Sequence, residues 1–170
     1  MRIRLQTTIP CPVTYLASQT TSNRMTLGEY IKRKNGVAMG QAGSLRNNLH
    51  RSLGAASFAN FWTYWNPIFG YSLGRYVFKP LKRFLPVGLS LVLTFVCCGL
   101  IHDAVTVLFR GSTSFFFTGW FLLMGLATLA SKLFRQNHAN QRWLIRALAN
   151  LSVIGVCFLI TLYVTRWVLG

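Results

Sequence analysis

Acidic residues are almost absent from this 170-residue sequence. It contains 18 lysine and arginine residues but only two acidic ones, Glu29 and Asp103, so its formal net charge is +16. A basic excess of this size can indicate nucleic-acid binding. Here, however, the basic residues lie outside three long apolar runs, and basic flanks around apolar segments are typical of proteins at an anionic membrane surface. The composition therefore favours anionic lipid, and no nucleic acid, as a partner.

Cysteine is also scarce, with four residues in the chain. Cys97 and Cys98 are adjacent and, like Cys157, fall inside apolar runs. No Cys-x-x-Cys pattern or Cys/His spacing of a metal site occurs. We interpret these thiols as small buried apolar groups. The sequence predicts neither a metal nor a bound cofactor.

Three apolar runs cover residues 87–109, 114–131 and 147–165. Each approaches the roughly 20 residues that a helix needs to cross about 30 Å of hydrocarbon. Only helices or closed barrels satisfy their backbone hydrogen bonds in lipid, and these runs lack the strict alternation of barrel strands. The sequence therefore predicts an all-α membrane protein with three transmembrane helices.

Lysine and arginine alternate in number between the segments that join these runs. The segment before the first run carries Arg75, Lys79, Lys82 and Arg83. The loop before the second run carries only Arg110. The loop before the third carries Lys132, Arg135, Arg142 and Arg146. The positive-inside rule then places the N-terminus and the last of these loops in the cytoplasm, and the C-terminus outside.

The chain before the membrane domain, residues 58–170, divides into two polar parts. Residues 1–24 have no periodicity and no apolar core of signal-peptide length, so we interpret them as disordered or as a mis-started N-terminus, with Met25 as the true start. Residues 25–57 form a polar, basic segment that we assign to the cytoplasm.

An uncharged aromatic stretch, "FANFWTYWNPIFGY", opens the membrane domain. Asn66 followed by Pro67 is typical of a helix N-cap with proline at the first helical position. We expect a helix from Pro67 towards Phe78 that stops before Pro80. The rings before Asn66 would lie at the headgroup level, so the stretch predicts an interfacial or re-entrant helical segment ahead of the first span. For Asn66 itself, a cap alone remains an alternative to a functional role.

Two ionisable residues, His102 and Asp103, lie within the first span. His102 is about 6 Å from the middle of the run, and an ionisable group at that depth marks a functional site by default. Adjacent residues on a helix do not face each other, so we expect one of the pair to face a cavity and the other the helix bundle. A histidine that only bonds a neighbouring helix remains the alternative.

The stretches "FWTYWNPIFGYSLGRYVFKPL" and "LTFVCCGLIHD" together resemble the membrane-bound O-acyltransferase family. The shared features are an aromatic element ending in Trp-Asn, a basic and aromatic helix, and a histidine inside an apolar span. The spacing between Asn66 and His102 is also similar. The resemblance covers residues 58–105.

That resemblance implies acyl transfer from a thioester donor such as acyl-CoA to a hydroxyl acceptor. His102 would be the general base, and Asn66 would orient the reacting groups. The expected substrate-binding residues are Trp62, Trp65, Arg75, Lys79 and Asp103. The basic residues among them, with Lys82 and Arg83, would meet donor phosphates or anchor lipid headgroups.

The sequence departs from the family in two respects. Members usually have eight or more spans, so this chain resembles the C-terminal portion of such an enzyme, either truncated or completed by oligomerisation or a partner membrane protein. It also carries His-Asp where several relatives carry His-Glu. The alternative function is a noncatalytic small membrane subunit that binds lipid or a partner protein.

The charge pattern makes a testable prediction about topology. A reporter fused after Gly170 should lie outside the cytoplasm, and one inserted at positions 136–140 should lie inside, because the second loop is basic. Protease protection in sealed vesicles measures both. Finding the two reporters on the same side would contradict three spans.

Overall fold

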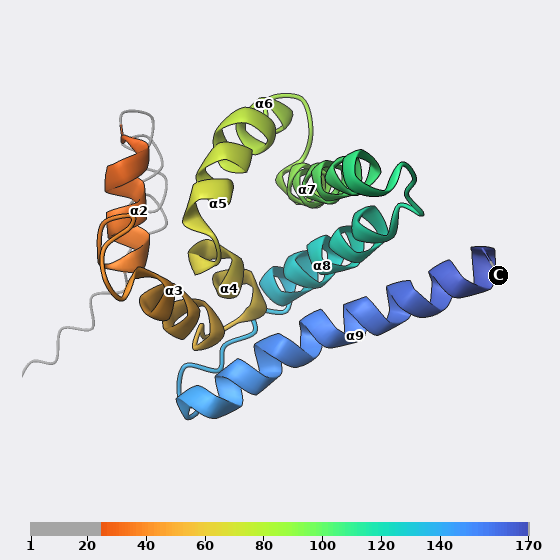
Figure 1. Ribbon diagram of the computed structural model, residues 1–170. Helices are drawn as coiled ribbons and strands as arrows, with labels where there is room; N and C mark the ends of the chain where they lie inside the picture. The colour runs from red at the N-terminus through yellow and green to blue at the C-terminus, as the bar shows by residue number, and fades with distance from the viewer. Residues whose placement is uncertain (1–24, 170) are drawn as a thin grey trace, which may run out of the picture.

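The structure, a computed structural model, describes residues 25–169, and the predicted disordered or mis-started segment 1–24 lies outside the described residues (Figure 1). The described part of the chain is helical and contains no strand. Its elements are α2 (Leu27–Asn35), α3 (Ser44–Leu53), α4 (Phe58–Tyr64), α5 (Pro67–Leu73), the π-helix η1 (Gly74–Phe78), α6 (Lys79–Leu81), α7 (Val87–Arg110), α8 (Phe116–Leu133) and α9 (Trp143–Leu169).

Three of these helices, α7, α8 and α9, are long and apolar enough to cross a membrane, which confirms the predicted fold class. Helix α9 begins at Trp143, four residues before the predicted run, because the hydropathy pattern marks the apolar part of a helix and not its basic first turn. Figure 1 shows α7 and α8 side by side, with α9 running past α8 so that its C-terminal end lies far from α2 and α3.

Close packing of α7 against α8 depends on two glycines. A Cβ atom at Gly99 would lie 2.6 Å from the Thr118 Cα atom, which is closer than such atoms approach. A Cβ atom at Gly125 would lie 3.0 Å from the Phe95 Cβ atom. Small residues let helix backbones approach in a membrane, so these two positions set the separation of α7 and α8.

A buried carboxylate near the end of α7 also links this helix to the start of α8. Asp103 on α7 is 2% exposed and accepts four hydrogen bonds, three from the first turn of α8 and one from the loop before it. The donors are Thr118 Oγ1 at 2.6 Å, Thr118 N at 2.8 Å, Thr113 Oγ1 at 3.0 Å and Phe117 N at 3.2 Å. The N-cap residue Phe115 has no side-chain cap bond, so Asp103 satisfies amides that its own helix leaves open and lies at the positive end of the helix dipole.

The aromatic stretch forms a helical segment ahead of the first span, as predicted, and this α4–α6 segment doubles back on itself. Helix α4 begins beside the last turn of α8, where Ala59 N donates to Ser131 Oγ at 3.3 Å. On α5, the Phe69 ring lies 6.0 Å from the His102 ring in the second half of α7. The chain then returns through η1 and α6 to the start of α7. Within α4, Phe61 is buried, and the Trp62 ring lies edge-on to Phe95 at 5.0 Å.

The prediction of a helix end before Pro80 is wrong, because helical structure continues through α6 to Leu81. In a regular α-helix a proline ring clashes with the carbonyl four residues earlier. Here η1 precedes Pro80, and Lys79 N donates to the Gly74 carbonyl, five residues back. This wider turn moves the clashing carbonyl and leaves room for the proline within the helical path.

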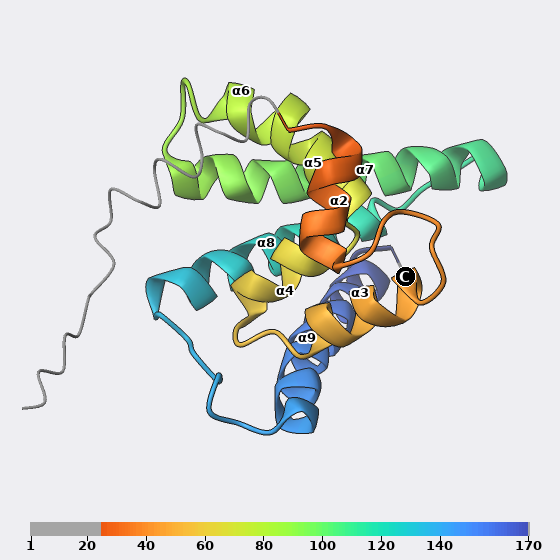
Figure 2. The same ribbon diagram turned by 90° about the vertical axis from the view of Figure 1, so that its left-hand side faces the viewer.

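The segment expected only to be polar and basic contains α2 and α3, which cover α5 and α9 (Figure 2). Helix α2 begins with a capping box between Thr26 and Glu29 and ends at Gly36, whose φ is 86°. Its docking on α5 includes a 3.1 Å hydrogen bond from Tyr71 Oη to the Met25 carbonyl. The Thr-x-x-Glu pattern was a readable signal for this helix.

Because Asp103 accepts four hydrogen bonds, replacing it by asparagine should destabilise the protein. Asp103→Asn should lower the free energy of unfolding by roughly 1–3 kcal/mol, because an amide NH₂ would face donors that need an acceptor. Thr118→Val removes only one of the four bonds and should cost less. Melting temperatures in one detergent compare the variants. Equal melting of Asp103→Asn and the wild type would contradict a stabilising role for the carboxylate.

Candidate functional site

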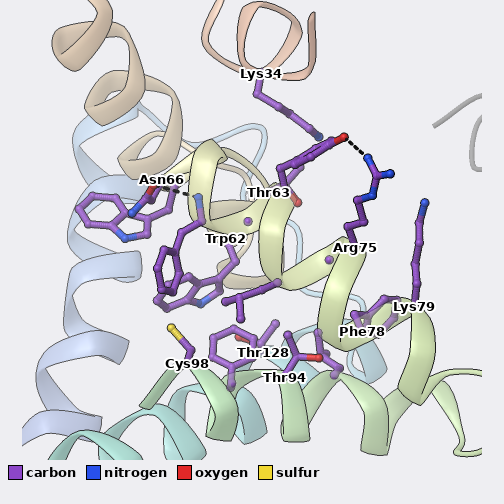
Figure 3. Close-up of a pocket in the computed structure, with 18 of the residues that line it drawn as sticks. Lys34, Trp62, Thr63, Asn66, Arg75, Phe78, Lys79, Thr94, Cys98 and Thr128 are labelled. Carbon is purple, nitrogen blue, oxygen red and sulfur yellow. Dashed lines mark hydrogen bonds between the residues drawn. The ribbon is translucent and has the colours of Figure 1, made fainter. Parts of the chain in front are cut away.

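A cavity of about 990 Å³ lies between α2, the α4–α6 segment and the α7–α8 pair. This volume is within the roughly 300–1,000 Å³ typical of small-molecule sites. Six predicted site residues line it: Trp62, Trp65, Asn66, Arg75, Lys79 and His102. Figure 3 shows Lys34, Arg75 and Lys79 on one side of it, and Trp62 extending from α4 towards Cys98. The cavity therefore joins residues from segments that are distant in the sequence.

The imidazole of His102 is held in one tautomer. Its Nδ1 atom lies 2.9 Å from the Cys98 carbonyl oxygen, one turn earlier on α7. A carbonyl oxygen only accepts hydrogen bonds, so Nδ1 carries the proton and donates it. In the neutral ring the lone pair is then on Nε2, which can accept a proton from a ligand.

Three phenylalanine rings surround this imidazole. The ring centroid of His102 lies 5.0 Å from that of Phe121, 5.6 Å from that of Phe117 and 6.0 Å from that of Phe69. Two of these rings belong to α8 and one to α5. The orientation of His102 therefore depends on the packing of three helices, in addition to its own hydrogen bond.

Asn66 forms the predicted N-cap of α5, which confirms that interpretation. Its Oδ1 atom accepts a hydrogen bond of 3.3 Å from Phe69 N, and its backbone is left-handed, with φ 39°. Among the described residues, the NH₂ group of the same amide has no hydrogen-bond partner. Asn66 thus positions Phe69, whose ring contacts His102, and retains a donor at the cavity wall.

Asp103 is the one predicted site residue that does not line the cavity. Its carboxylate points into the α7–α8 pair, whereas His102 lines the cavity. The expectation that one of the two residues faces a cavity and the other the bundle is therefore confirmed. All four hydrogen bonds that Asp103 accepts come from α8 and the loop before it, so its position is that of a structural group.

Basic side chains dominate the mouth of the cavity, and among the described residues no acidic side chain lines it. The basic lining residues are Arg33, Lys34, Arg75, Lys79, Lys82, Arg83 and Lys132. Sequence reasoning missed Arg33, Lys34 and Lys132, because they belong to α2 and to the end of α8. Arg33 and Lys34 have the pattern of an ordinary solvated charge run, and only the docking of α2 on α5 brings them to the site.

Two of these cations are held by aromatic residues. The Nζ atom of Lys34 lies 5.7 Å from the ring centroids of both Tyr30 and Tyr64, and burial, with the nearby Arg33, lowers the pKa of Lys34. Arg75 Nη1 donates to Tyr71 Oη at 2.9 Å, which raises the pKa of Arg75 (Figure 3). These contacts orient positive charge at the cavity mouth before any ligand binds.

The inner wall is mainly apolar and aromatic. The hydroxyls of Thr94 and Thr128 each donate to a carbonyl of their own helix, so they present little free hydrogen-bonding capacity. Trp62 Nε1 is buried and has no acceptor among the described residues. The cavity thus combines a basic mouth, an apolar wall and one imidazole, an arrangement suited to an amphiphile with an anionic head.

No protein-family model matches the chain, and neither a curated protein nor a solved structure matches it.

Substitutions of Asn66 separate its cap from its free NH₂ group. Asn66→Ala should cost about 1 kcal/mol of stability for the lost cap and about 1 kcal/mol more for the left-handed backbone. Asn66→Asp keeps an equally good cap and should stay within about 0.5 kcal/mol of the wild type. Thermal unfolding in detergent measures both. A similar loss for both variants would contradict the cap as the source of the stability.

Proposed function

We propose that this cavity is the acyl-transfer site of a membrane-bound O-acyltransferase, in which His102 takes a proton from a hydroxyl acceptor. The observation that carries this conclusion is the hydrogen bond from His102 Nδ1 to the Cys98 carbonyl. It leaves the Nε2 lone pair for the acceptor, in a cavity that Asn66 also lines. The resemblance of residues 58–105 to that family supports the same assignment.

The proposed reaction moves an acyl group from sulfur to oxygen. The acceptor O–H gives its proton to His102 Nε2 while the oxygen attacks the carbonyl carbon of a thioester. The C–S bond then breaks, the imidazolium returns the proton to the leaving thiolate, and the products are an ester and a free thiol. The NH₂ group of Asn66 would donate to the thioester oxygen, where negative charge develops.

The basic mouth supports an anionic donor such as acyl-CoA. Arg75 and Lys79, with the neighbouring cations of α2 and α8, would bind phosphate groups, while Trp62 and Trp65 would contact the acyl chain or acceptor. No cofactor beyond this thioester co-substrate is proposed.

The charge pattern supports a topology with the N-terminus in the cytoplasm and the C-terminus outside. Anionic lipids would then contact the basic segments on the cytoplasmic side. A second copy of the chain, or a partner membrane protein, would complete the wall around the substrates. The open side of the cavity favours such an assembly.

A noncatalytic membrane subunit is the second candidate function. It is favoured by the surface of α9, a helix long enough to span a membrane. Leu159, Tyr163 and Trp167 are exposed on this helix. Such a surface suits lipid or a partner protein. In this case the cavity would bind an anionic amphiphile without acyl transfer.

Release of free thiol from palmitoyl-coenzyme A tests the proposal. The purified protein in vesicles is supplied in parallel with diacylglycerol, a sterol and a long-chain alcohol as acceptors. His102→Ala should reduce thiol release and ester formation by roughly 10²–10⁴-fold, because it removes the positioned base. The matched control is His138→Ala, since His138 is an exposed residue that does not line the cavity.

Binding of a thioether analogue of the donor distinguishes the two functions. An O-acyltransferase should bind the analogue equally well with and without His102. If Asn66 and His102 act together, the double variant Asn66→Asp/His102→Ala should lose less rate than the sum of the two single losses in free energy. Analogue binding by the wild type without thiol release from any acceptor mixture would support the noncatalytic subunit. Equal rates for His102→Ala and the wild type would refute His102 as the base.

A further inference from the structure

Helix α3 exposes apolar side chains on the outside of the molecule. Leu45 is 72% exposed and Leu49 is 36% exposed. The two residues lie one turn apart and therefore share one face of the helix. The next leucine on that face, Leu53, packs partly against the hydrophobic core. The apolar face of α3 therefore starts at the core and continues outwards without protein to cover it among the described residues.

Helix α9, which packs on α3, also exposes leucines in its first turns. Leu144 and Leu148 in the first turns of α9 are 61% and 59% exposed. A shallow groove between the two helices is lined by Leu45, Arg46, Leu49, His50, Leu53 and Trp143. Because α9 is one of the helices that can span a membrane, the leucines of α3 extend a surface that already suits lipid.

Hydrogen bonds fix α3 at a defined level along α9. Trp143 Nε1 donates to the His50 carbonyl at 3.0 Å, and the two rings stack at 5.3 Å. Further along, Asn150 Nδ2 donates to the carbonyls of Leu53 and Ala55 at 2.9 and 3.0 Å. Asn150 lies one turn beyond Arg146, the last charged residue before the apolar part of α9. The C-terminal end of α3 therefore lies beside the start of the apolar part of α9.

We propose that α3 is an interfacial helix whose Leu45–Leu49 face binds the surface of a bilayer containing anionic phospholipid. The acyl chains would cover the two leucines together with Leu144 and Leu148. The exposed Arg46 and Arg142 would meet headgroup phosphates, as basic residues beside an apolar helix face do. This surface is separate from the cavity, and it assigns part of the segment expected in the cytoplasm to the membrane.

Contact between α3 and lipid also bears on the cavity. Asn48, on the same helix, donates from Nδ2 to the Tyr64 carbonyl at 2.7 Å. Tyr64 ends α4, two residues before Asn66. The level at which α3 rests on the bilayer thus sets the level of the α4–α5 turn and of the cavity mouth.

Site-directed spin labelling of the full chain tests this surface. The four native cysteines are replaced by alanine, and a nitroxide is attached to Leu45→Cys, Leu49→Cys or, as the control, Lys32→Cys on the exposed side of α2. In vesicles of phosphatidylcholine and phosphatidylglycerol, labels at 45 and 49 should collide more with oxygen than with a water-soluble nickel chelate. The label at 32 should show the reverse preference.

Two outcomes would overturn the proposal. Labels at 45 and 49 that prefer the nickel chelate as strongly as the label at 32 would place α3 in water. Immobilised labels that neither reagent reaches would show that a second copy or a protein partner covers the face. Melting temperatures of the labelled variants in detergent, equal to that of the cysteine-free parent, verify that the fold is kept. A weaker preference for oxygen in vesicles of phosphatidylcholine alone is expected, because the arginines then lose their anionic headgroups.

Discussion

The four hydrogen bonds that Asp103 accepts from the start of α8 and the loop before it are the constraint on which the rest of this structure depends. A carboxylate buried between two apolar helices is stable only when its oxygens are satisfied, and here two open amides of a helix N-terminus and two threonine hydroxyls satisfy them. Because adjacent helical residues point about 100° apart, the interaction that points Asp103 at the residues around the start of α8 leaves His102 on the side of α7 that lines the cavity. The position of the imidazole is thus a consequence of how its neighbour is buried.

The α4–α6 segment supplies the opposite wall, and its geometry is set by Asn66. The amide oxygen of Asn66 caps α5 through Phe69 N, and the Phe69 ring then contacts His102. A single side chain therefore caps the start of α5 and orients a ring against the candidate base. The π-helix that follows accommodates Pro80 and allows the segment to return to α7 with its cations directed at the cavity mouth.

Electrostatics determines which ligands suit this site. Cations from α2, from the segment between α5 and α7, and from the end of α8 converge on one opening, and the two acidic side chains of the chain lie elsewhere. Tyr30, Tyr64 and Tyr71 hold two of these cations in place. A ligand with a negative head and an apolar body fits both ends of the cavity, and a bilayer that contains anionic lipid suits the leucines and arginines of α3 in the same way.

The sequence by itself determined the helical class, the three apolar spans and the cap at Asn66, because these depend on local composition and on residues a few positions apart. It also singled out His102 and Asp103, since ionisable residues are costly in an apolar run. It did not determine that Arg33, Lys34 and Lys132 share a site with His102, that the helix continues through Pro80, or that α3 lies along α9. Those features depend on packing between segments far apart in the chain. The separation of α7 and α8 and the docking of α2 decide which side chains meet, and no local pattern encodes them.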